Sequence, residues 1–172
     1  MTIFQPPQSG TAVAKCATVY GLNPGVMMAR RARYCFSLLI LREAEPHDPQ
    51  EYVEFDETYG CDTIRVLDNL VFAELEVPSD AVVTKEYEPH EDADCIVIDV
   101  FATKQIFRFV KEHPPNTVPE LQITLKIPQG TSDRRIQVSM EFGKTHISVT
   151  ACLVANAAVK FEARIKSSRF VV

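Results

Sequence analysis

The sequence predicts a mainly β protein, an antiparallel β-sandwich of about eight strands preceded by one short α-helix. The main observation is that apolar and polar residues alternate almost without error at 121–127, 136–142, 147–153 and 159–165. Side chains on a strand point to opposite faces in turn, so these segments predict an antiparallel meander with one dry and one wet face. Such a sheet needs a second layer on its dry face, and 172 residues are enough to supply one.

A short helix is predicted near the N-terminus. Either Ser9 or Thr11 can cap its first turn. Its apolar residues have the i, i+3, i+4, i+7 spacing of one helix face: Val13, Cys16, Ala17 and Tyr20. Gly21 followed by Pro24 is expected to end the helix.

Further strands are predicted between this helix and the C-terminal segments. Tyr34–Leu41 is apolar on both faces, whereas the acidic region 42–62 is predicted to be a loop with one edge strand at Tyr52–Phe55. Four strand-like segments follow, the last two joined by an acidic loop at 86–94: Thr63–Val66, Leu70–Leu75, Val82–Tyr87 and Cys95–Phe101.

The composition restricts the classes of function. A formal net charge of −5, spread over short runs, argues against nucleic acid or a membrane surface as the partner. There is no apolar run of about 18 residues and no signal-peptide pattern, so a location in the cytosol or nucleus is expected, and of these we predict a cytoplasmic one. No CxxC pair occurs, and reduced thiols are expected at all five cysteines: Cys16, Cys35, Cys61, Cys95 and Cys152.

No group of residues predicts catalysis or a metal site. The four histidines lack ligand-like spacing: His47, His90, His113 and His146. The sequence contains no nucleophile elbow and no phosphate-binding glycine loop, so we expect neither an enzyme nor a bound cofactor.

One predicted strand departs from the alternating pattern, because Cys95–Ile98 is apolar on both faces. Two interpretations stay open. The strand is central and covered on both sides, or one face packs in the core while the other lines an apolar groove. Together with Tyr34–Leu41, such a strand would form the floor of a peptide-sized cleft.

Two segments resemble a known family. The stretch AVAKCATVYGLNPGVMMARRAR at Ala12–Arg33 resembles the junction between the ATPase and peptide-binding domains of the seventy-kilodalton heat-shock chaperones. It is most similar to the divergent branch called heat shock 70 kDa protein 12. Arg134–Ile165, with the core MxFGxTxIxVTA at Met140–Ala151, resembles the last strands of that branch. The resemblance starts near Ala12, is loose between residues 42 and 80, and departs from the family at Cys16, where glycine is common.

The resemblance implies a stress-response chaperone part whose lidless sandwich binds extended hydrophobic peptide segments. Residues 1–24 would be a lead-in with the last ATPase-domain helix, and residues 25–172 the substrate-binding sandwich. An upstream ATPase domain is implied as a partner, and ATP would bind only there. The implied peptide-binding residues, with His90 as an alternative to Pro89 in an arch over the peptide, are Leu38, Leu41, Tyr87, Pro89, Ile96, Ile98 and Ile136.

A second interpretation is a non-catalytic interaction or oligomerisation module whose cleft has filled in. The two interpretations differ in the surroundings of Leu38, Tyr87, Ile96 and Ile98. In a binding groove these side chains reach solvent, whereas in a filled cleft they are packed by Phe101 and its neighbours.

We predict that the purified chain does not bind ATP, because its sequence contains no glycine-rich phosphate loop. Titration calorimetry with ATP and magnesium is expected to give no saturable heat. Micromolar binding would contradict this prediction.

Overall fold

The computed structural model describes residues 9–22, 29–78, 80–90, 93–114, 117–142 and 146–166. Within these residues the elements follow one another in this order: α1 (Ser9–Leu22), β1 (Ala29–Arg31), β2 (Cys35–Glu43), η2 (Gln50–Tyr52), β3 (Val53–Asp56), β4 (Cys61–Val71), β5 (Glu76–Pro78), β6 (Val82–Tyr87), β7 (Cys95–Thr103), η3 (Val110–Glu112), β8 (Leu121–Lys126), β9 (Ile136–Phe142), β10 (His146–Leu153) and β11 (Asn156–Lys166). The predicted class is confirmed, with more strands than the eight or so expected.

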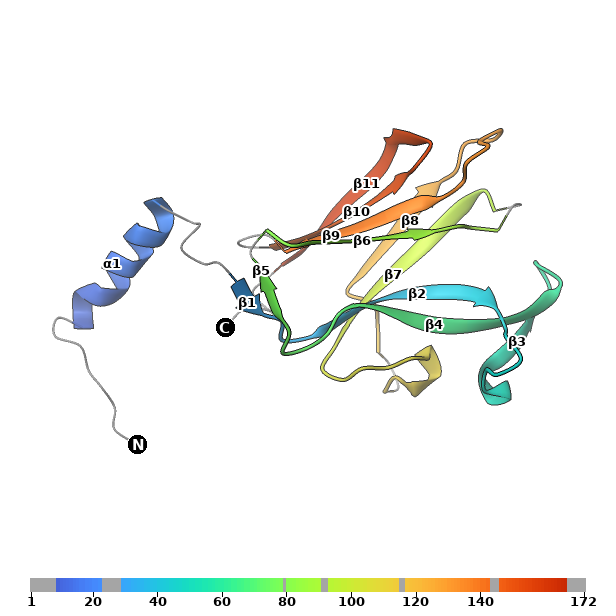
Figure 1. Cartoon of the computed structure of the whole chain (residues 1–172), viewed down its shortest axis with the longest axis horizontal. Coiled ribbons are helices and arrows are strands. Elements are labelled where there is room, and N and C mark those ends of the chain that lie inside the picture. Colours follow the sequence, from blue (N-terminus) through green and yellow to red (C-terminus); the bar gives the residue numbers. More distant parts are fainter. Residues whose placement is uncertain are drawn as a thin grey trace.

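Two antiparallel sheets form the layers of the sandwich (Figure 1). One has the strand order β11-β10-β9-β6, and the other has the order β3-β4-β2-β7-β8. Strands β1 and β5 form a separate two-stranded ladder. The edge strands β8 and β11 contact each other and close one long side of the sandwich.

The core lies between the two sheets and is built from the apolar residues of the alternating patterns. Ile136, Val138 and Met140 of β9 are fully buried, as are Leu38 and Val100 in the opposite sheet. Each buried side chain of this size stabilises the fold by about 1.5–3 kcal/mol relative to an exposed one. The dry face predicted from the sequence is therefore the inner face of the sandwich.

Two details of the predicted strands are wrong. The four C-terminal segments do not form one meander, because β8 pairs with β7 in the other sheet while β9, β10 and β11 pair in order. Alternation determines which face of a strand is dry but not which strand is its neighbour. The strands expected at Thr63–Val66 and Leu70–Leu75 are parts of one long strand, β4, which ends at Val71. The edge strand expected near Tyr52–Phe55 is confirmed as β3.

The outer face of the five-stranded sheet is covered in part by the segment 104–114. The Ser37 hydroxyl donates to the Asn69 amide oxygen at 2.7 Å, and the Asn69 amide nitrogen donates to the Phe107 carbonyl at 3.1 Å. The backbone N–H of Leu67 donates to the carbonyl of Arg108. This covering explains why β2 is apolar on both faces: Cys35–Leu38 is buried on both sides.

Helix α1 agrees with the helix predicted from the sequence, and it stands apart from the two main sheets in Figure 1. Its residues Ala17, Val19 and Leu22 are exposed. The side chains of Val13, Cys16 and Tyr20 lie outside the described part of the chain, and the domain boundary at residue 24 stays a prediction. No helix within the described residues is both long enough and apolar enough to cross a lipid bilayer.

The thiols agree with the sequence prediction as far as they are described. Four cysteines are free, with no disulfide among them: Cys35, Cys61, Cys95 and Cys152.

His113, near the end of the covering segment, lies in an aromatic environment. Its ring meets Phe101 and Phe107 edge-on, with centroids at 5.0 and 4.8 Å. Both ring nitrogens are buried, and neither has a hydrogen-bond partner within the described residues. Desolvation therefore lowers the pKa of His113 below its usual 6.5, partly opposed by the charge of Glu112.

We predict that His113 makes the fold less stable in mild acid. Because its pKa is lower in the folded state, the unfolded chain binds more protons as the pH falls through about 6.5. The stabilisation from the neutral ring is present above that pH and decreases below it. The free energy of unfolding, measured with urea across this pH range, should decrease less with falling pH in His113→Phe than in the parent chain. In the exposed control His47→Gln it should decrease as much as in the parent. Equal slopes for His113→Phe and the parent would contradict the prediction.

Candidate functional site

Strands β2 and β7 pair over only part of their length. Their ladder runs from Cys35–Thr103 to Leu38–Val100 and then stops. Beyond this point β2 continues to Glu43 beside β4, and β7 extends back to Cys95 beside β8. The two strands diverge as a fork toward one end of the sandwich (Figure 1). Within the described residues, Leu39–Glu43 and Cys95–Asp99 therefore have no strand partner on the sides that face the fork.

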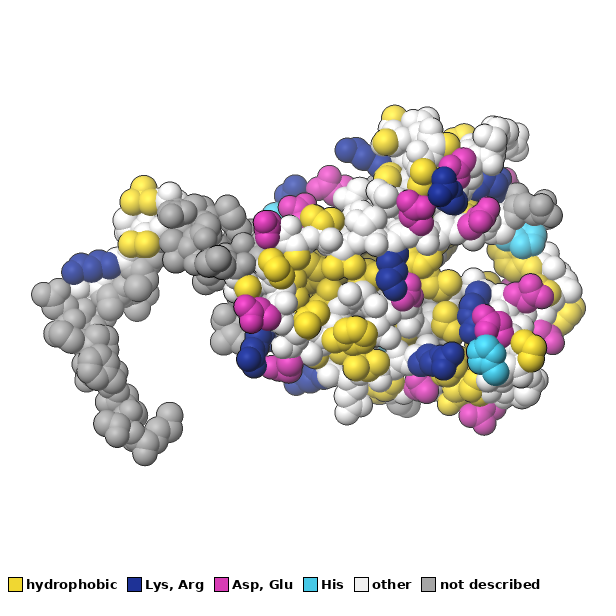
Figure 2. Space-filling view, in the orientation of Figure 1, with side chains coloured by type: hydrophobic (Ala, Val, Ile, Leu, Met, Phe, Trp, Pro, Cys, Tyr) yellow, Lys and Arg dark blue, Asp and Glu magenta, His cyan; other side chains and the backbone are white. Residues whose placement is uncertain are grey.

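Apolar side chains line both arms of the fork. Leu41 on β2 is 43% exposed and Val97 on β7 is 50% exposed, on the outer face of the sheet. On the inner face, Ile40 and Ile96 are half-buried and pack against the edge of the core. The space-filling view shows a hollow at this end of the molecule, bordered by hydrophobic side chains (Figure 2). The fork thus offers unpaired backbone and apolar contacts together.

Two loops meet across the mouth of the fork. The ring of Tyr59, in the turn between β3 and β4, lies 4.5 Å from the ring of His90, in the loop between β6 and β7. The turn presents Tyr59 because the Asp56 carboxylate accepts from the backbone N–H of Thr58, and because Gly60 adopts a φ of +66°. This contact joins the tip of the five-stranded sheet to the loop that enters β7.

Both sides of the mouth are anchored by arginines. The Arg134 guanidinium donates to the carbonyl oxygens of Ala93 and His90, which fixes the loop before β7. On the other side, Arg42 donates two hydrogen bonds, at 2.8 and 2.9 Å, to the buried Asp48 carboxylate. These bonds, with one from the backbone of Glu45, lower the pKa of Asp48 to about 2. The loop between β2 and β3 is thus fixed by an ionised carboxylate.

A polar cluster connects the two sheets beside the inner end of the fork. Asp68 of β4 lies opposite Leu38, the last β2 residue paired with β7. Its carboxylate accepts from the Lys85 ammonium and, at 2.8 Å, from the Tyr87 hydroxyl, both on β6. Burial, and then the hydrogen bond to Asp68, raise the pKa of Tyr87, so its hydroxyl remains a donor. We call these three residues the Asp68 clasp.

The residues implied by the family resemblance lie in three environments. Leu38, Ile98 and Ile136 are in the core between the sheets, and Tyr87 and Ile96 are half-buried at its edge. Leu41 is exposed on the fork, and Pro89 is half-buried in the loop before β7. Their role in peptide binding stays a prediction. Sequence reasoning missed Asp68 and Lys85, although the alternation of Val83, Lys85 and Tyr87 places Lys85 on the inner face of β6.

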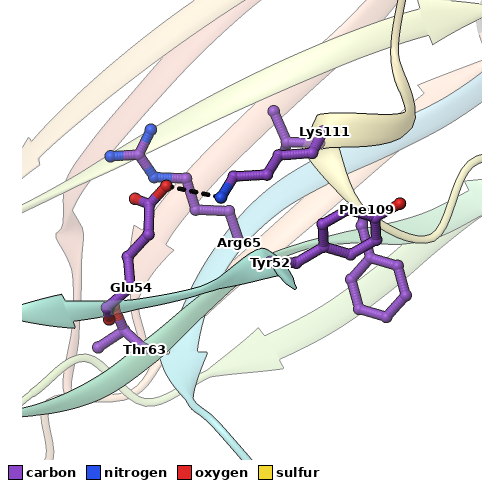
Figure 3. Close-up of a pocket in the computed structure, with 7 residues that line it drawn as sticks. Tyr52, Glu54, Thr63, Arg65, Phe109 and Lys111 are labelled. Carbon is purple, nitrogen blue, oxygen red and sulfur yellow. Dashed lines mark hydrogen bonds and ion pairs between the residues drawn. The ribbon is translucent and has the colours of Figure 1, made fainter. Parts of the chain in front are cut away.

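A separate small pocket lies on the outer face, between β3, β4 and η3 (Figure 3). Lys111 and Glu54 form an ion pair at 2.9 Å, and the rings of Tyr52 and Phe109 lie 5.2 Å apart. The hydrogen bond from Lys111 lowers the pKa of Glu54. The cavity is about 60 Å³, much smaller than the roughly 300 Å³ or more of a typical ligand site. The ion pair between Lys111 and Glu54 joins η3 to β3, so the pocket has a structural explanation. It is a weaker candidate for a binding site than the fork.

The described residues contain no cluster of three or more His, Cys, Asp or Glu side chains placed to hold a metal ion. The candidate site is therefore described by its backbone, its apolar side chains and the Asp68 clasp.

Comparison with known proteins supports the resemblance noted in the sequence. The chain is 28% identical to heat shock 70 kDa protein 12A of Homo sapiens over 162 residues, which are 90% of this chain and 24% of that protein. It is 28% identical to the Mus musculus protein of the same name over 156 residues, 87% of this chain and 23% of that protein. The chain thus spans about a quarter of the length of these curated relatives. No family model and no solved structure matches it. The similarity to a divergent branch of the 70 kDa heat-shock proteins is confirmed.

We predict that Leu38 and Leu41 differ sharply in their contribution to stability. Leu38→Ala removes buried methyl groups from the core and should lower the free energy of unfolding by about 2–5 kcal/mol. Leu41→Ala changes a partly exposed side chain and should cost less than about 1 kcal/mol. Chemical denaturation of both variants checks the difference. Similar losses for the two would show that the fork is packed as tightly as the core.

Proposed function

We propose that this chain binds extended, apolar segments of other polypeptides in the fork between β2 and β7. It would do so as part of a divergent, chaperone-like 70 kDa heat-shock protein in the cytoplasm. The bound segment would lie along the fork as an additional strand. Its backbone would pair with β2 or β7, and its side chains would contact Leu41, Val97 and their neighbours.

The observation that carries this proposal is the early end of the β2–β7 ladder. Backbone N–H and C=O groups need partners, and a strand with a free side is a template for an incoming extended chain. Peptide recognition by strand addition obtains affinity from such backbone bonds and specificity from pockets for alternate side chains. The exposed Leu41 and Val97 supply apolar contacts on both arms of the fork.

The similarity to heat shock 70 kDa protein 12A supports a relationship to heat-shock proteins. Because the matched region is about a quarter of that relative, any use of ATP is proposed for an upstream domain of a longer protein. We propose that this chain acts as a binding module and not as an enzyme.

One observation favours the alternative, an interaction or oligomerisation module with a filled cleft. Leu38 and Ile98, both expected in an open groove, are 0% and 3% exposed. They are packed by the opposite sheet, since Phe101 lies on the other face of β7. In this alternative the fork would be covered by a second copy of the chain instead of a client peptide.

We predict that a charged side chain in the fork weakens peptide binding without unfolding the chain. Val97→Lys and Leu41→Lys replace exposed apolar side chains at the site and should weaken binding of apolar peptides by about tenfold or more. Val82→Lys is the matched control, because Val82 is a strand valine of similar exposure, 56%, at the far end of β6. Fluorescence anisotropy with a panel of labelled, extended apolar peptides gives the affinities.

Three outcomes separate the interpretations. Selective loss in the two fork variants supports peptide binding there. An equal loss of affinity in Val82→Lys would show that the peptides bind elsewhere than in the fork. If no peptide in the panel binds the parent chain but sedimentation shows a dimer that Val97→Lys dissociates, the oligomerisation module is correct.

A further inference from the structure

The two long sides of the sandwich are closed by different chemistry. On one side, strands β8 and β11 contact each other directly. On the other side, the edge strand β6 lies across from β4, and the Asp68 clasp spans the distance between them. The apolar core ends where the clasp begins, because Asp68 is adjacent to the buried Leu38 across the β2–β4 ladder.

The clasp is built from side chains that face the interior. Along β6, Val83, Lys85 and Tyr87 are half-buried while Val82, Thr84 and Glu86 are exposed. A carboxylate and an ammonium at such positions are costly unless they are paired. Here both oxygens of Asp68 have a donor, and the Tyr87 hydroxyl provides one of them. The three residues therefore stabilise one another only while β6 stays next to β4.

The clasp is also accessible to water. The side chains of Asp68 and Lys85 are 29% and 38% exposed. If β6 moves away from β4, water can replace each lost hydrogen bond, and the apolar side chains of β6 that become uncovered, Val83 and Tyr87, are only half-buried to begin with. On the other side, β8 and β11 bury Ile123, Leu125 and Ile165 almost completely, so we infer that the side at β6 opens at a smaller free-energy cost. The clasp lies next to the point where the β2–β7 ladder ends. Opening it would separate the two sheets beside β2, which is one of the two arms of the fork.

We propose that the Asp68 clasp sets the rate at which polypeptide segments enter and leave the fork. This inference rests on the function proposed above and adds its regulation. Entry and exit pass through the same opened state, in which β6 has separated from β4. Weakening the clasp lowers the cost of that state for both directions, so both rates rise while the equilibrium affinity changes little.

The test compares variants of the clasp with a control on the same strand. Asp68→Asn keeps the shape of the side chain and removes its charge, and Tyr87→Phe keeps the ring and removes the hydroxyl. Glu86→Gln is the control, because Glu86 points outward on β6 and pairs with Arg135 at 3.2 Å. The exchanged pair Asp68→Lys/Lys85→Asp is designed to restore the attraction with the charges reversed.

Stopped-flow fluorescence with one labelled apolar peptide gives the association and dissociation rates. We expect Asp68→Asn and Tyr87→Phe to raise both rates by about threefold to tenfold. Glu86→Gln should stay within about twofold of the parent. The exchanged pair restores the ion pair but leaves the Tyr87 hydroxyl without its acceptor, so its rates should match those of Tyr87→Phe. Hydrogen exchange without peptide provides an independent readout, and the amides of β6 should exchange faster in the two clasp variants than in Glu86→Gln.

The two proposals fail in different ways. If the parent chain binds no peptide, the binding function is wrong, whatever the clasp does. If the parent binds peptide but Asp68→Asn and Tyr87→Phe leave both rates and the β6 exchange unchanged, the function stands and the clasp proposal is overturned. Faster exchange without faster peptide kinetics also overturns it, because the clasp then holds the sheets without controlling the fork.

Discussion

The early end of the β2–β7 ladder is the constraint on which the rest of this structure depends. A β-sheet is stable when each interior strand has partners on both sides, yet here the pairing stops at Leu38 and Val100. The backbone groups beyond that point must remain wet or find a partner from another chain. The divergence leaves Leu41 and Val97 exposed on the outer face, and it leaves the loops at that end to bridge the opening.

The features around the fork follow from this constraint. Arg42 with Asp48 and Arg134 with Ala93 fix the loops on either side, so the arms keep their separation. Each anchor uses a charged side chain bonded to a defined acceptor, which holds a loop more precisely than apolar contact can. The Tyr59–His90 contact is of another kind, since two rings at 4.5 Å can separate without leaving a buried charge. We therefore expect the loops held by Arg42 and Arg134 to be rigid, and the contact between Tyr59 and His90 to be less rigid.

Sequence reasoning predicted the layers well and the site less well, for physical reasons. Alternation in β9 and β10 reports burial directly, because one face of each strand is dry. In the edge strand β11 it does so less well, since Ile165 is buried but Phe161 is 38% exposed. It could not assign β8 to the other sheet, since pairing depends on the path of the connecting loop. The pattern of β4 is interrupted at Asp68 and Asn69, whose polar side chains serve the clasp and the bond to Ser37. That interruption produced two predicted strands where one exists, and it falls at the residue that forms the clasp, Asp68.

The difference between the two long sides bears on how such a sandwich can admit a chain without losing its fold. Separating β8 from β11 would expose apolar surface, at about 25 cal/mol for each Å². Separating β6 from β4 breaks the hydrogen bonds of the clasp, which water can replace at about 0.5–1.5 kcal/mol each, and uncovers Val83 and the Tyr87 ring, which are already half-buried. The sandwich should therefore open at the clasp and keep its contact at β8 and β11, which acts as the fixed side.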